Sequence, residues 1–332
     1  MWKKVSKFSN AGISVTSYKS ERTSLRGPYR IAIFFSSFEP RCLTCSTLLP
    51  KGSVQESIIV FFKEKDPVGL RHKHDKIILR NVIKATKGRT VKMKAISTSK
   101  MEEGITSLLC RIVRSKLYPN DKILIDTSGA PMPFFLSILS YLRRLSSPPN
   151  IHLFHPTGEY PKPKAKRNYV FHTGHDRYMW TPWLWGQQDP SRKTTFVFLL
   201  GFEGNRALTV RSRFQPDTCF AVIGSPGYTS RYQRIAREKN KEFLKGVPQS
   251  NVILAHAADV PKAWKTLQFN LGKLSETTNL CIVPLGTKSH GISAALFALS
   301  LVTPSIMYVL PKKFECIATK RGKMLWLYDI KV

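Results

Sequence analysis

Short apolar runs of strand length, each followed by a segment of helix length, are the feature that most constrains the fold of this chain. The first run, residues 30–36 (RIAIFFS), has no alternation of polar and apolar side chains. A strand that is apolar on both faces must be covered on both faces, as in a parallel sheet flanked by helices. Further strands of this kind are expected at residues 58–62, 91–96, 122–126 and 151–154. Residues 30–159 are therefore predicted to form a doubly wound unit of five strands.

The same order of apolar runs and helical segments begins again at residue 194. Strands are expected at residues 195–200, 219–223, 252–255, 280–283 and 306–310. The turns after the two first strands are also similar, since FFSSFEPR at 34–41 and LLGFEGNR at 199–206 both place Phe-Glu shortly before an Arg. We therefore predict an α/β fold, a tandem repeat of two Rossmann-like, mainly parallel five-stranded βα units. The second unit is expected to span residues 194–332.

The N-terminus, the cysteines and one long apolar run bear on location. Residues 1–29 are basic and Ser-rich and lack the apolar centre of a secretory signal, so a basic N-terminal arm is expected, with a mitochondrial transit peptide as the alternative. The six cysteines lie mostly in apolar runs, where a free Cys behaves as a small hydrophobe. The mostly apolar run at 291–310 is interrupted by Pro304, which favours a buried helix followed by a buried strand over a membrane span. A cytoplasmic protein with no membrane partner is predicted.

A large excess of positive charge is the strongest global property of the sequence. The chain has 53 Lys and Arg against 21 Asp and Glu, a formal net charge of +32. Such a charge attracts polyanions and accelerates their association without specifying which one binds. It favours a nucleic acid or an RNA-containing complex as the partner. An anionic membrane surface and a lysine-rich composition with no functional meaning are the alternatives.

Between the two units, residues 160–193 form a linker that combines a basic run with clustered tryptophans. The candidate nucleic-acid contacts in this linker are Lys162, Lys164, Lys166, Arg167, Trp183 and Trp185. Lys and Arg neutralise phosphates while aromatic rings stack on bases, a combination that suits single-stranded nucleic acid. The alternative is a linker that buried tryptophans hold against the units. The basic helix expected over 231–245 carries Arg231 and Arg234 near its start and is either a further phosphate contact or a solvated face.

A candidate phosphate site lies in residues 279–300, where an apolar strand leads through a tight turn into a buried helix. The turn carries Gly286, Thr287 and Lys288. Backbone N–H groups, a hydroxyl and a positive charge at a helix N-terminus suit a phosphate group. Lys288 would contact the phosphate, Gly286 would allow the backbone to approach closely, and Thr287 would donate a hydrogen bond.

Ligands of open α/β sheets bind at the carboxyl ends of the strands, where the strand order reverses. The turns after the first and fourth strands of each unit are therefore expected to line a crevice. Besides the turn at 286–288, the candidate contacts in the second unit are Gly201, Glu203 and Arg206. The candidate contacts in the first unit are Ser128 and Gly129. Ala130 and Pro131 follow them where a Lys would be needed, so the second unit carries the better-formed site.

Acidic side chains at strand ends are few, and the candidates for catalysis are Glu39, Asp126 and Glu203. A metal-dependent nuclease would cluster carboxylates in one unit, and Glu39 with Asp126 is the pair that could do so. The alternative for Glu39 and Glu203 is an ion pair with Arg41 or Arg206 in the first helical turn.

Two His/Asp clusters, HKHD at 72–75 and HTGHD at 172–176, could bind a metal, but neither has a recognisable third ligand. Both are expected to be solvated polar residues. Neither a metal nor a cofactor is predicted.

The turn LGTKSHG at 285–291 resembles the Gly-Thr-Lys signature of the CRISPR-associated Rossmann-fold (CARF) family, sensors of cyclic oligonucleotides. The resemblance covers a few residues of the second unit and its strand order. It implies that Gly286, Thr287 and Lys288 face a bound nucleotide, with Gly201 to Arg206 as the second contacting turn. Members of the family usually carry a fused effector nuclease or helix-turn-helix module. Since neither is recognisable here, the resemblance implies a separate effector protein.

These observations lead to three functional hypotheses. The first is a nucleotide- or nucleic-acid-binding component of a prokaryotic antiviral defence system, non-catalytic or weakly catalytic, whose ligand is RNA, DNA or a cyclic or linear oligonucleotide. The second is an enzyme that cleaves phosphodiester or glycosidic bonds in the crevice between the units. The third is a basic scaffold protein in an RNA-containing assembly.

Overall fold

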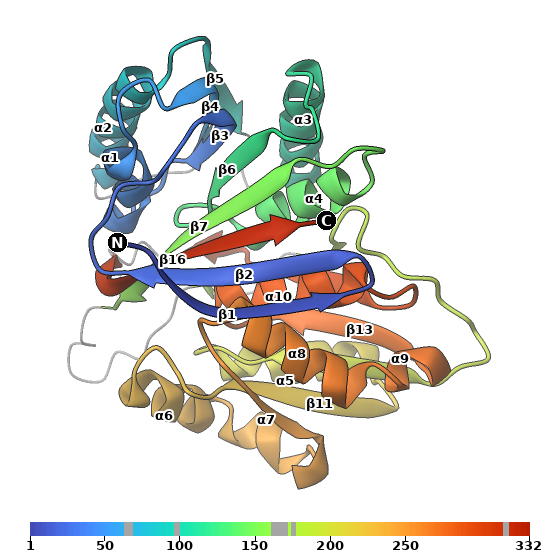
Figure 1. Cartoon of the computed structure of the whole chain (residues 1–332). Helices are drawn as coiled ribbons and strands as arrows, with labels where there is room; N and C mark the ends of the chain where they lie inside the picture. Colours follow the sequence, from blue (N-terminus) through green and yellow to red (C-terminus); the bar gives the residue numbers. More distant parts are fainter. Residues whose placement is uncertain (63–68, 96–99, 161–171, 174–176, 315–318) are drawn as a thin grey trace. The chain divides into compact units, whose positions relative to one another are not determined.

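The computed structural model describes residues 1–62, 69–95, 100–160, 172–173, 177–314 and 319–332 (Figure 1). The chain divides into two compact units. Unit 1 comprises Met1–Val5, Ser14–Lys162 and Cys316–Val332, and unit 2 comprises Ser6–Ile13 and Pro163–Glu315. In each unit, mostly parallel strands alternate with helices. The prediction of an α/β fold is therefore confirmed at the level of two mostly parallel sheets with alternating helices.

An eight-stranded sheet is the centre of unit 1, although residues 6–10 of its first strand fall in unit 2. Its strands are β1 (Lys3–Asn10), β2 (Ile13–Ser20), β3 (Tyr29–Phe35), β4 (Val54–Phe62), β5 (Thr90–Ala95), β6 (Lys122–Asp126), β7 (Asn150–Glu159) and β16 (Lys320–Lys331). Their order in the sheet is β1-β2-β16-β7-β6-β3-β4-β5. Strands β3 to β7 pair in parallel, whereas β16 is antiparallel to both β7 and β2.

Two pairs of helices cover this sheet. The helices are α1 (Thr44–Leu48), α2 (Leu70–Ala85), α3 (Met101–Arg114) and α4 (Met132–Arg143), with a 3-10 helix at Pro40–Leu43. α1 packs on α2, and α3 packs on α4 (Figure 1). Ile78 of α2 belongs to the same apolar core as Phe34 of β3. Phe134 of α4 packs edge-on against Phe35 and Phe62, with ring centroids 5.6 Å apart in both cases.

A six-stranded sheet is the centre of unit 2. Its strands are β9 (Arg177–Trp180), β10 (Thr194–Leu199), β11 (Thr218–Gly224), β12 (Val252–Ala255), β13 (Asn279–Pro284) and β14 (Ser305–Leu310). Their order is β12-β11-β10-β13-β14-β9, parallel throughout except for β9, which runs antiparallel to β14. A separate two-stranded ribbon pairs β8 (His172–Thr173) with β15 (Lys313–Phe314).

Helices cover both faces of the unit 2 sheet. They are α5 (Gly204–Phe214), α6 (Ser230–Lys239), α7 (Lys241–Lys245), α8 (Val260–Leu271), α9 (Leu274–Thr277) and α10 (Lys288–Leu299), with a 3-10 helix at Gln249–Asn251. Val210 of α5 and Phe243 of α7 share an apolar core with Phe198 of β10. On the other face α8 packs on α10, and α10 is buried from Ser289 to Ala298. Among the helices in the described ranges, none is long and apolar enough to cross a membrane.

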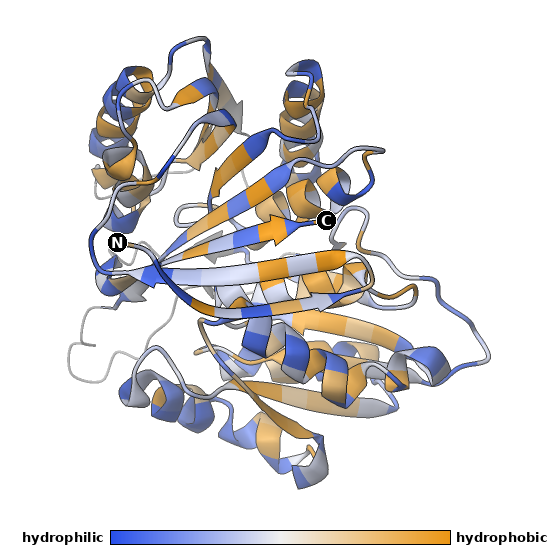
Figure 2. Ribbon diagram, viewed as in Figure 1, coloured by the Kyte–Doolittle hydropathy of each residue, from blue (hydrophilic) through white to orange (hydrophobic). Residues whose placement is uncertain are grey.

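The parallel strands follow the same spatial order in both units. Numbered within each unit, they lie as 3-2-1-4-5, which is β5-β4-β3-β6-β7 in unit 1 and β12-β11-β10-β13-β14 in unit 2. The order therefore reverses between β3 and β6, and between β10 and β13. The strands form from apolar runs because both of their faces are covered. β13, for example, is buried at every position and is mostly hydrophobic in Figure 2. The helix α6, by contrast, is mostly hydrophilic there.

The two ends of the chain and the linker do not follow the predicted domain boundaries. Residues expected to form a basic arm are the strands β1 and β2, joined by a tight turn in which Ala11 and Gly12 have φ angles of 48° and 76°. Lys320–Lys331, expected in the second unit, is β16 in the sheet of unit 1, between β2 and β7. Arg177–Trp180, in the middle of the predicted linker, is β9 in the sheet of unit 2. Pairing partners far along the chain, which a local pattern does not specify, account for these differences.

The place of β16 in the core of unit 1 can be tested at Leu325. This side chain is fully buried and belongs to the same core as Phe154. We expect Leu325→Ala to lower the free energy of unfolding by about 2–5 kcal/mol, because it leaves a cavity in a closely packed core. Lys331→Ala, at an exposed position of the same strand, should change it by less than about 0.5 kcal/mol. Urea unfolding followed by circular dichroism measures both, and equal effects would contradict the assignment.

Candidate ligand site at the strand-end turns

The turns after β10 and β13 meet where the strand order of unit 2 reverses. A Cβ atom added at Gly201 would lie 2.3 Å from the carbonyl oxygen of Leu285. A Cβ atom added at Gly286 would lie 2.7 Å from the carbonyl oxygen of Leu200. Side chains are excluded at such distances, so both glycines are required by the contact between the two turns. Gly201 and Gly286, predicted as ligand contacts, are thus brought together at one end of the sheet.

Thr287 caps the N-terminus of α10. As the N-cap residue, its hydroxyl oxygen accepts a hydrogen bond from the backbone N–H of His290 at 3.1 Å. The same hydroxyl donates to the carbonyl oxygen of Ala257 at 2.9 Å. The predicted donation from Thr287 to a ligand does not fit this arrangement, because a hydroxyl has one proton and this one is directed to Ala257.

Lys288 is the first residue of α10, and its side chain is half-buried. The first turn of an α-helix carries a partial positive charge from its backbone N–H groups, and a cation placed there adds to it. Lys288 therefore gives the end of β13 a local positive potential. The side chain lies at the point where the strand order reverses, which is where open α/β sheets bind ligands.

Glu203 and Arg206 form an ion pair next to this turn. Nη1 of Arg206 lies 2.9 Å from Oε2 of Glu203, and both side chains are close to nine-tenths buried. The other terminal nitrogen of Arg206 donates to the carbonyl oxygen of Val309 at the end of β14. Of the two roles predicted for Glu203, catalysis or an ion pair with Arg206, the structure shows the ion pair. Arg206 links the turn after β10 to the neighbouring strand end.

The turn after β11 contacts the start of α10. The hydroxyl of Tyr228 lies 3.3 Å from the hydroxyl of Ser289 in α10. α6 begins directly after this turn, with Arg231 half-buried and the Arg234 side chain 73% exposed. Arg234 lies 3.9 Å from Glu238 one helical turn further on. An exposed pair of this kind contributes little to stability, so Arg234 is a solvated residue that an anion can reach.

His290 was not singled out from the sequence, yet it is one of the most buried polar groups near the site. Burial lowers the pKa of His290 to about 4, while the backbone of Ala255 and His256 partly offsets this effect. Neither ring nitrogen makes a hydrogen bond with good geometry. The residue is therefore neutral at pH 7. The sequence did contain a signal for a buried His290, since it follows Lys288 by two residues in a helix that was predicted to be buried.

In unit 1, the fourth turn is held by its own side chains. Asp126 is fully buried, and its Oδ1 accepts hydrogen bonds from the hydroxyl of Ser128 and, at 2.9 Å, from its backbone N–H. An aspartate that binds the backbone two residues on closes a turn. A Cβ atom at Gly129 would lie 2.2 Å from the carbonyl oxygen of Phe35. Ser128, Gly129 and Asp126 thus hold this turn against the end of β3.

The prediction that the cluster at 72–75 is solvated is wrong for two of its members. Nδ1 of His74 lies 2.7 Å from the carbonyl oxygen of Ser37, and His74 is buried. Asp75 accepts a hydrogen bond from the hydroxyl of Ser36. Both connect α2 to the turn after β3. The signal in the sequence was helical spacing, because Arg71 and His74 precede the buried Ile78 on one face of α2.

Three carboxylates lie around the Cys42 thiol. Burial raises the pKa of Cys42, its hydrogen bond to the Ser37 carbonyl opposes this, and the charges of Asp126, Glu39 and Asp75 raise the pKa further. The predicted catalytic pair, Glu39 and Asp126, thus lies at one end of unit 1. Glu39 is paired with the guanidinium of Arg41, however, and Asp126 holds its own turn. Within the described residues, no group of three or more His, Cys, Asp or Glu side chains could hold a metal ion.

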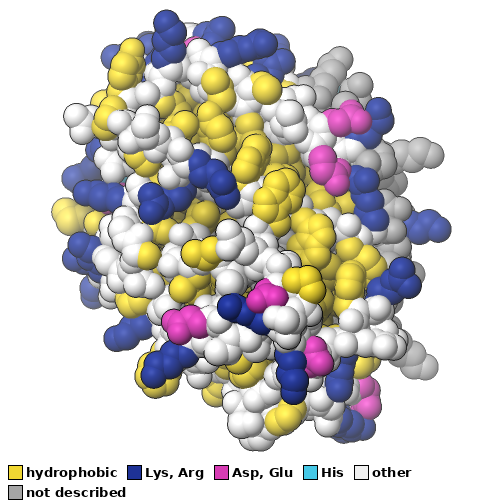
Figure 3. Space-filling view, turned by 90° about the vertical axis from the view of Figure 1, so that its right-hand side faces the viewer, with side chains coloured by type: hydrophobic (Ala, Val, Ile, Leu, Met, Phe, Trp, Pro, Cys, Tyr) yellow, Lys and Arg dark blue, Asp and Glu magenta, His cyan; other side chains and the backbone are white. Residues whose placement is uncertain are grey.

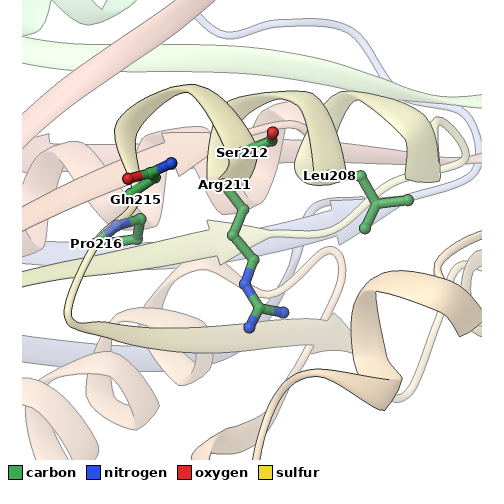
Figure 4. Close-up of a pocket in the computed structure, with 5 residues that line it drawn as sticks. All are labelled: Leu208, Arg211, Ser212, Gln215 and Pro216. Carbon is green, nitrogen blue, oxygen red and sulfur yellow. The ribbon is translucent and has the colours of Figure 1, made fainter.

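An open hollow lies on α5, away from these turns (Figure 4). Its volume is about 410 Å³, and it is lined by Leu208, Arg211, Ser212, Gln215 and Pro216. α5 begins near the carboxyl end of β10, so its last turn lies toward the opposite end of the sheet. The hollow is lined by none of the residues predicted to contact a ligand.

The predicted nucleic-acid contacts of the linker are only partly described. Lys162, Lys164, Lys166 and Arg167 lie outside the described residues. Trp183 is half-buried, and Trp185 is 62% exposed. The side chains that anchor this segment are Thr181 and Leu184, both buried, rather than the tryptophans.

No protein-family model matches the sequence, and no curated protein matches it. Among solved structures, the chain is similar to the cytoplasmic domain of a prokaryotic cation chloride cotransporter. The two are 9% identical over 87% of this chain and 98% of that chain, with a TM-score of 0.22. A likeness at this TM-score carries no argument about fold or function.

The structural role of Thr287 predicts a specific loss of stability. We expect Thr287→Ala to lower the free energy of unfolding by about 1 kcal/mol, because the variant loses the cap of α10 and the bond to Ala257. Thr287→Ser keeps the hydroxyl and should lose much less. Urea unfolding of both variants provides the measurement. Equal losses for Ala and Ser would contradict the capping role.

Burial of neutral His290 predicts a pH dependence of stability. As pH falls from about 6.5 to 4, His290 takes up a proton in the unfolded chain but not in the folded one, so the folded state loses stability. The loss from this group reaches on the order of 3 kcal/mol and is absent above pH 6.5. His290→Leu removes it. We expect the stability difference, variant minus wild type, to rise steadily as pH falls through this window, and a flat difference would refute the prediction.

Proposed function

We propose that this protein binds a nucleotide, or the phosphates of a nucleic acid, at the turns after β10 and β13 of unit 2. The observation that carries the proposal is the position of Lys288, the first residue of α10, where the strand order of the sheet reverses. A helix N-terminus and a Lys at such a reversal point together attract phosphate. Arg231 and Arg234, at the start of α6, add positive charge to the same end of the unit.

The overall charge supports a polyanionic ligand rather than a small neutral one. With a net charge of +32, the protein attracts nucleic acid over long distances. Figure 3 shows Lys and Arg side chains scattered over one face rather than gathered in a single stripe. A scattered charge raises the rate of association but does not define a site. In this proposal the turn at Lys288 supplies the defined contact.

We further propose that the two units are copies of one Rossmann-like unit in tandem. Both have the 3-2-1-4-5 strand order. Both have an acid-arginine ion pair after the first strand, Glu39 with Arg41 and Glu203 with Arg206. The copies differ in the turn after the fourth strand. Unit 1 has the buried Asp126 at the end of this strand, whereas the corresponding turn of unit 2 leads to Lys288 at the start of α10. An acid at this place repels phosphate, so binding is assigned to unit 2.

The likeness of LGTKSHG at 285–291 to the CARF signature supports a cyclic or linear oligonucleotide as the ligand and prokaryotic antiviral defence as the setting. The effector would be a separate protein. A binding role without catalysis is supported by the partners of the acids: Glu39 and Glu203 are ion-paired, and Asp126 holds its own turn.

The proposal is tested by removing the Lys288 amine. We expect Lys288→Ala to weaken binding of a labelled oligonucleotide by roughly ten- to a hundredfold, the effect of losing one charge-assisted hydrogen bond, with an unchanged melting temperature. Lys265→Ala, at an exposed position of α8, removes the same charge elsewhere in unit 2 and serves as the control. Fluorescence anisotropy with a cyclic oligonucleotide, an RNA and a DNA provides the measurement. Equal affinities of the two variants for all three ligands would refute the site.

A further inference from the structure

Three tryptophans lie along an ordered segment at the β9 edge of the unit 2 sheet. Trp180 ends β9 and is opposite Met307 of β14. A tight turn follows, in which the backbone N–H of Leu184 donates to the carbonyl oxygen of Thr181 at 2.9 Å. Trp183 is the third residue of this turn, and Trp185 comes directly after it. We call Trp180, Trp183 and Trp185 the tryptophan platform.

The backbone under the platform is firmly attached to the sheet. The N–H of Thr181 donates to the carbonyl oxygen of Ile306 at 2.8 Å, and the N–H of Ile306 donates to the carbonyl oxygen of Leu184 at 2.7 Å. The N–H of Gly186 donates to the hydroxyl of Ser305 at 2.9 Å. The segment is thus bonded to the start of β14 on both sides of the turn.

Two of the three rings are open to solvent. Trp185 is 62% exposed and Trp180 is 45% exposed, whereas Trp183 is half-buried. Val302, 67% exposed, is bonded to the same segment, because its carbonyl oxygen accepts a hydrogen bond from the N–H of Gln187. Large aromatic side chains held at the surface on a fixed backbone are typical of binding sites.

Trp183 has an unfavourable backbone conformation as well. Its φ angle is 58°, in the left-handed region, and this position of a turn is normally taken by Gly or Asn. A bulky residue there is an outlier that destabilises the turn. Such outliers occur preferentially at functional sites. A Trp at this position is therefore not explained by stability.

Basic side chains follow the platform along the chain. The exposed Lys193 ends the segment, and Arg192 before it is paired with Asp189 at 3.2 Å, whereas Arg177 lies opposite Leu310 at the other end of β14. A hydrogen bond from the Thr303 hydroxyl to the Ser275 carbonyl oxygen places the start of α9 nearby, and Lys273 is exposed there. Exposed rings flanked by cations match a chain of bases and phosphates. They do not match an uncharged peptide or lipid.

We propose that the tryptophan platform stacks on the unpaired bases of a single-stranded nucleic acid, whose phosphates Lys193 and Lys273 neutralise. The proposal rests on the polyanion binding proposed above and names the form of nucleic acid. A duplex does not fit, because its bases are stacked on one another and expose no faces. The site is separate from the Lys288 turn, since the platform lies beside the start of β14 and Lys288 follows the end of β13.

The test compares a single-stranded oligo(dT) with a duplex of equal length. We expect Trp180→Ala/Trp185→Ala to weaken oligo(dT) binding at least about fivefold per ring, the lower limit for base-aromatic stacking. Its affinity for the duplex and the salt dependence of binding should stay unchanged, because the phosphate contacts remain. The control is Tyr118→Ala, which removes an equally exposed ring from unit 1 and should bind as wild type.

A second variant controls for the possibility that the double variant misfolds. Trp183→Gly should raise or preserve the melting temperature, because Gly accepts the left-handed conformation, and should weaken oligo(dT) binding. If wild type binds both nucleic acids and neither variant changes oligo(dT) affinity, the platform is refuted while polyanion binding stands. If wild type binds neither, the platform proposal fails, and binding at the Lys288 turn is then decided by the cyclic oligonucleotide. Loss of duplex binding to the same extent as oligo(dT) would also refute stacking.

Discussion

Close backbone packing between the turns after β10 and β13 is the constraint on which the candidate site depends. Gly201 and Gly286 each press against a carbonyl oxygen of the opposite turn, so neither position has room for a side chain. This contact sets where β13 ends, and the Thr287 cap then sets the first residue of α10. The placement of Lys288 at the reversal point is thus a consequence of backbone packing and capping.

In both units, polar side chains at the strand ends are engaged within the protein. Glu39 and Glu203 are ion-paired, Asp126 closes a turn, and His74 connects a helix to a turn. Such groups are costly to bury unless they are hydrogen-bonded, so they act first as structure. What differs between the units is the sign of the charge at the fourth turn: a buried acid in unit 1 and a Lys in unit 2. In the proposed function, that difference assigns an anionic ligand to unit 2.

Much of the fold could be predicted because burial on both faces leaves a continuous apolar run in the sequence. The ion pairs of Glu39 and Glu203 were also accessible, as one of two interpretations, because their arginines lie two and three residues away. The place of β16 was not, since its partners β2 and β7 lie far along the chain. The same holds for the Thr287 hydroxyl and the His74 ring, whose partners Ala257 and Ser37 are 30 and 37 residues distant. Only the folded chain shows that these polar groups are already occupied.

Amide hydrogen exchange of the wild-type protein, with and without a saturating oligonucleotide, tests the central claim most directly. If phosphate is bound at the N-terminus of α10, the backbone N–H groups of residues 285–291 should exchange more slowly in the complex. The corresponding turn of unit 1, residues 126–131, should be unaffected. Unchanged exchange at 285–291 in a complex that is protected elsewhere would contradict the account.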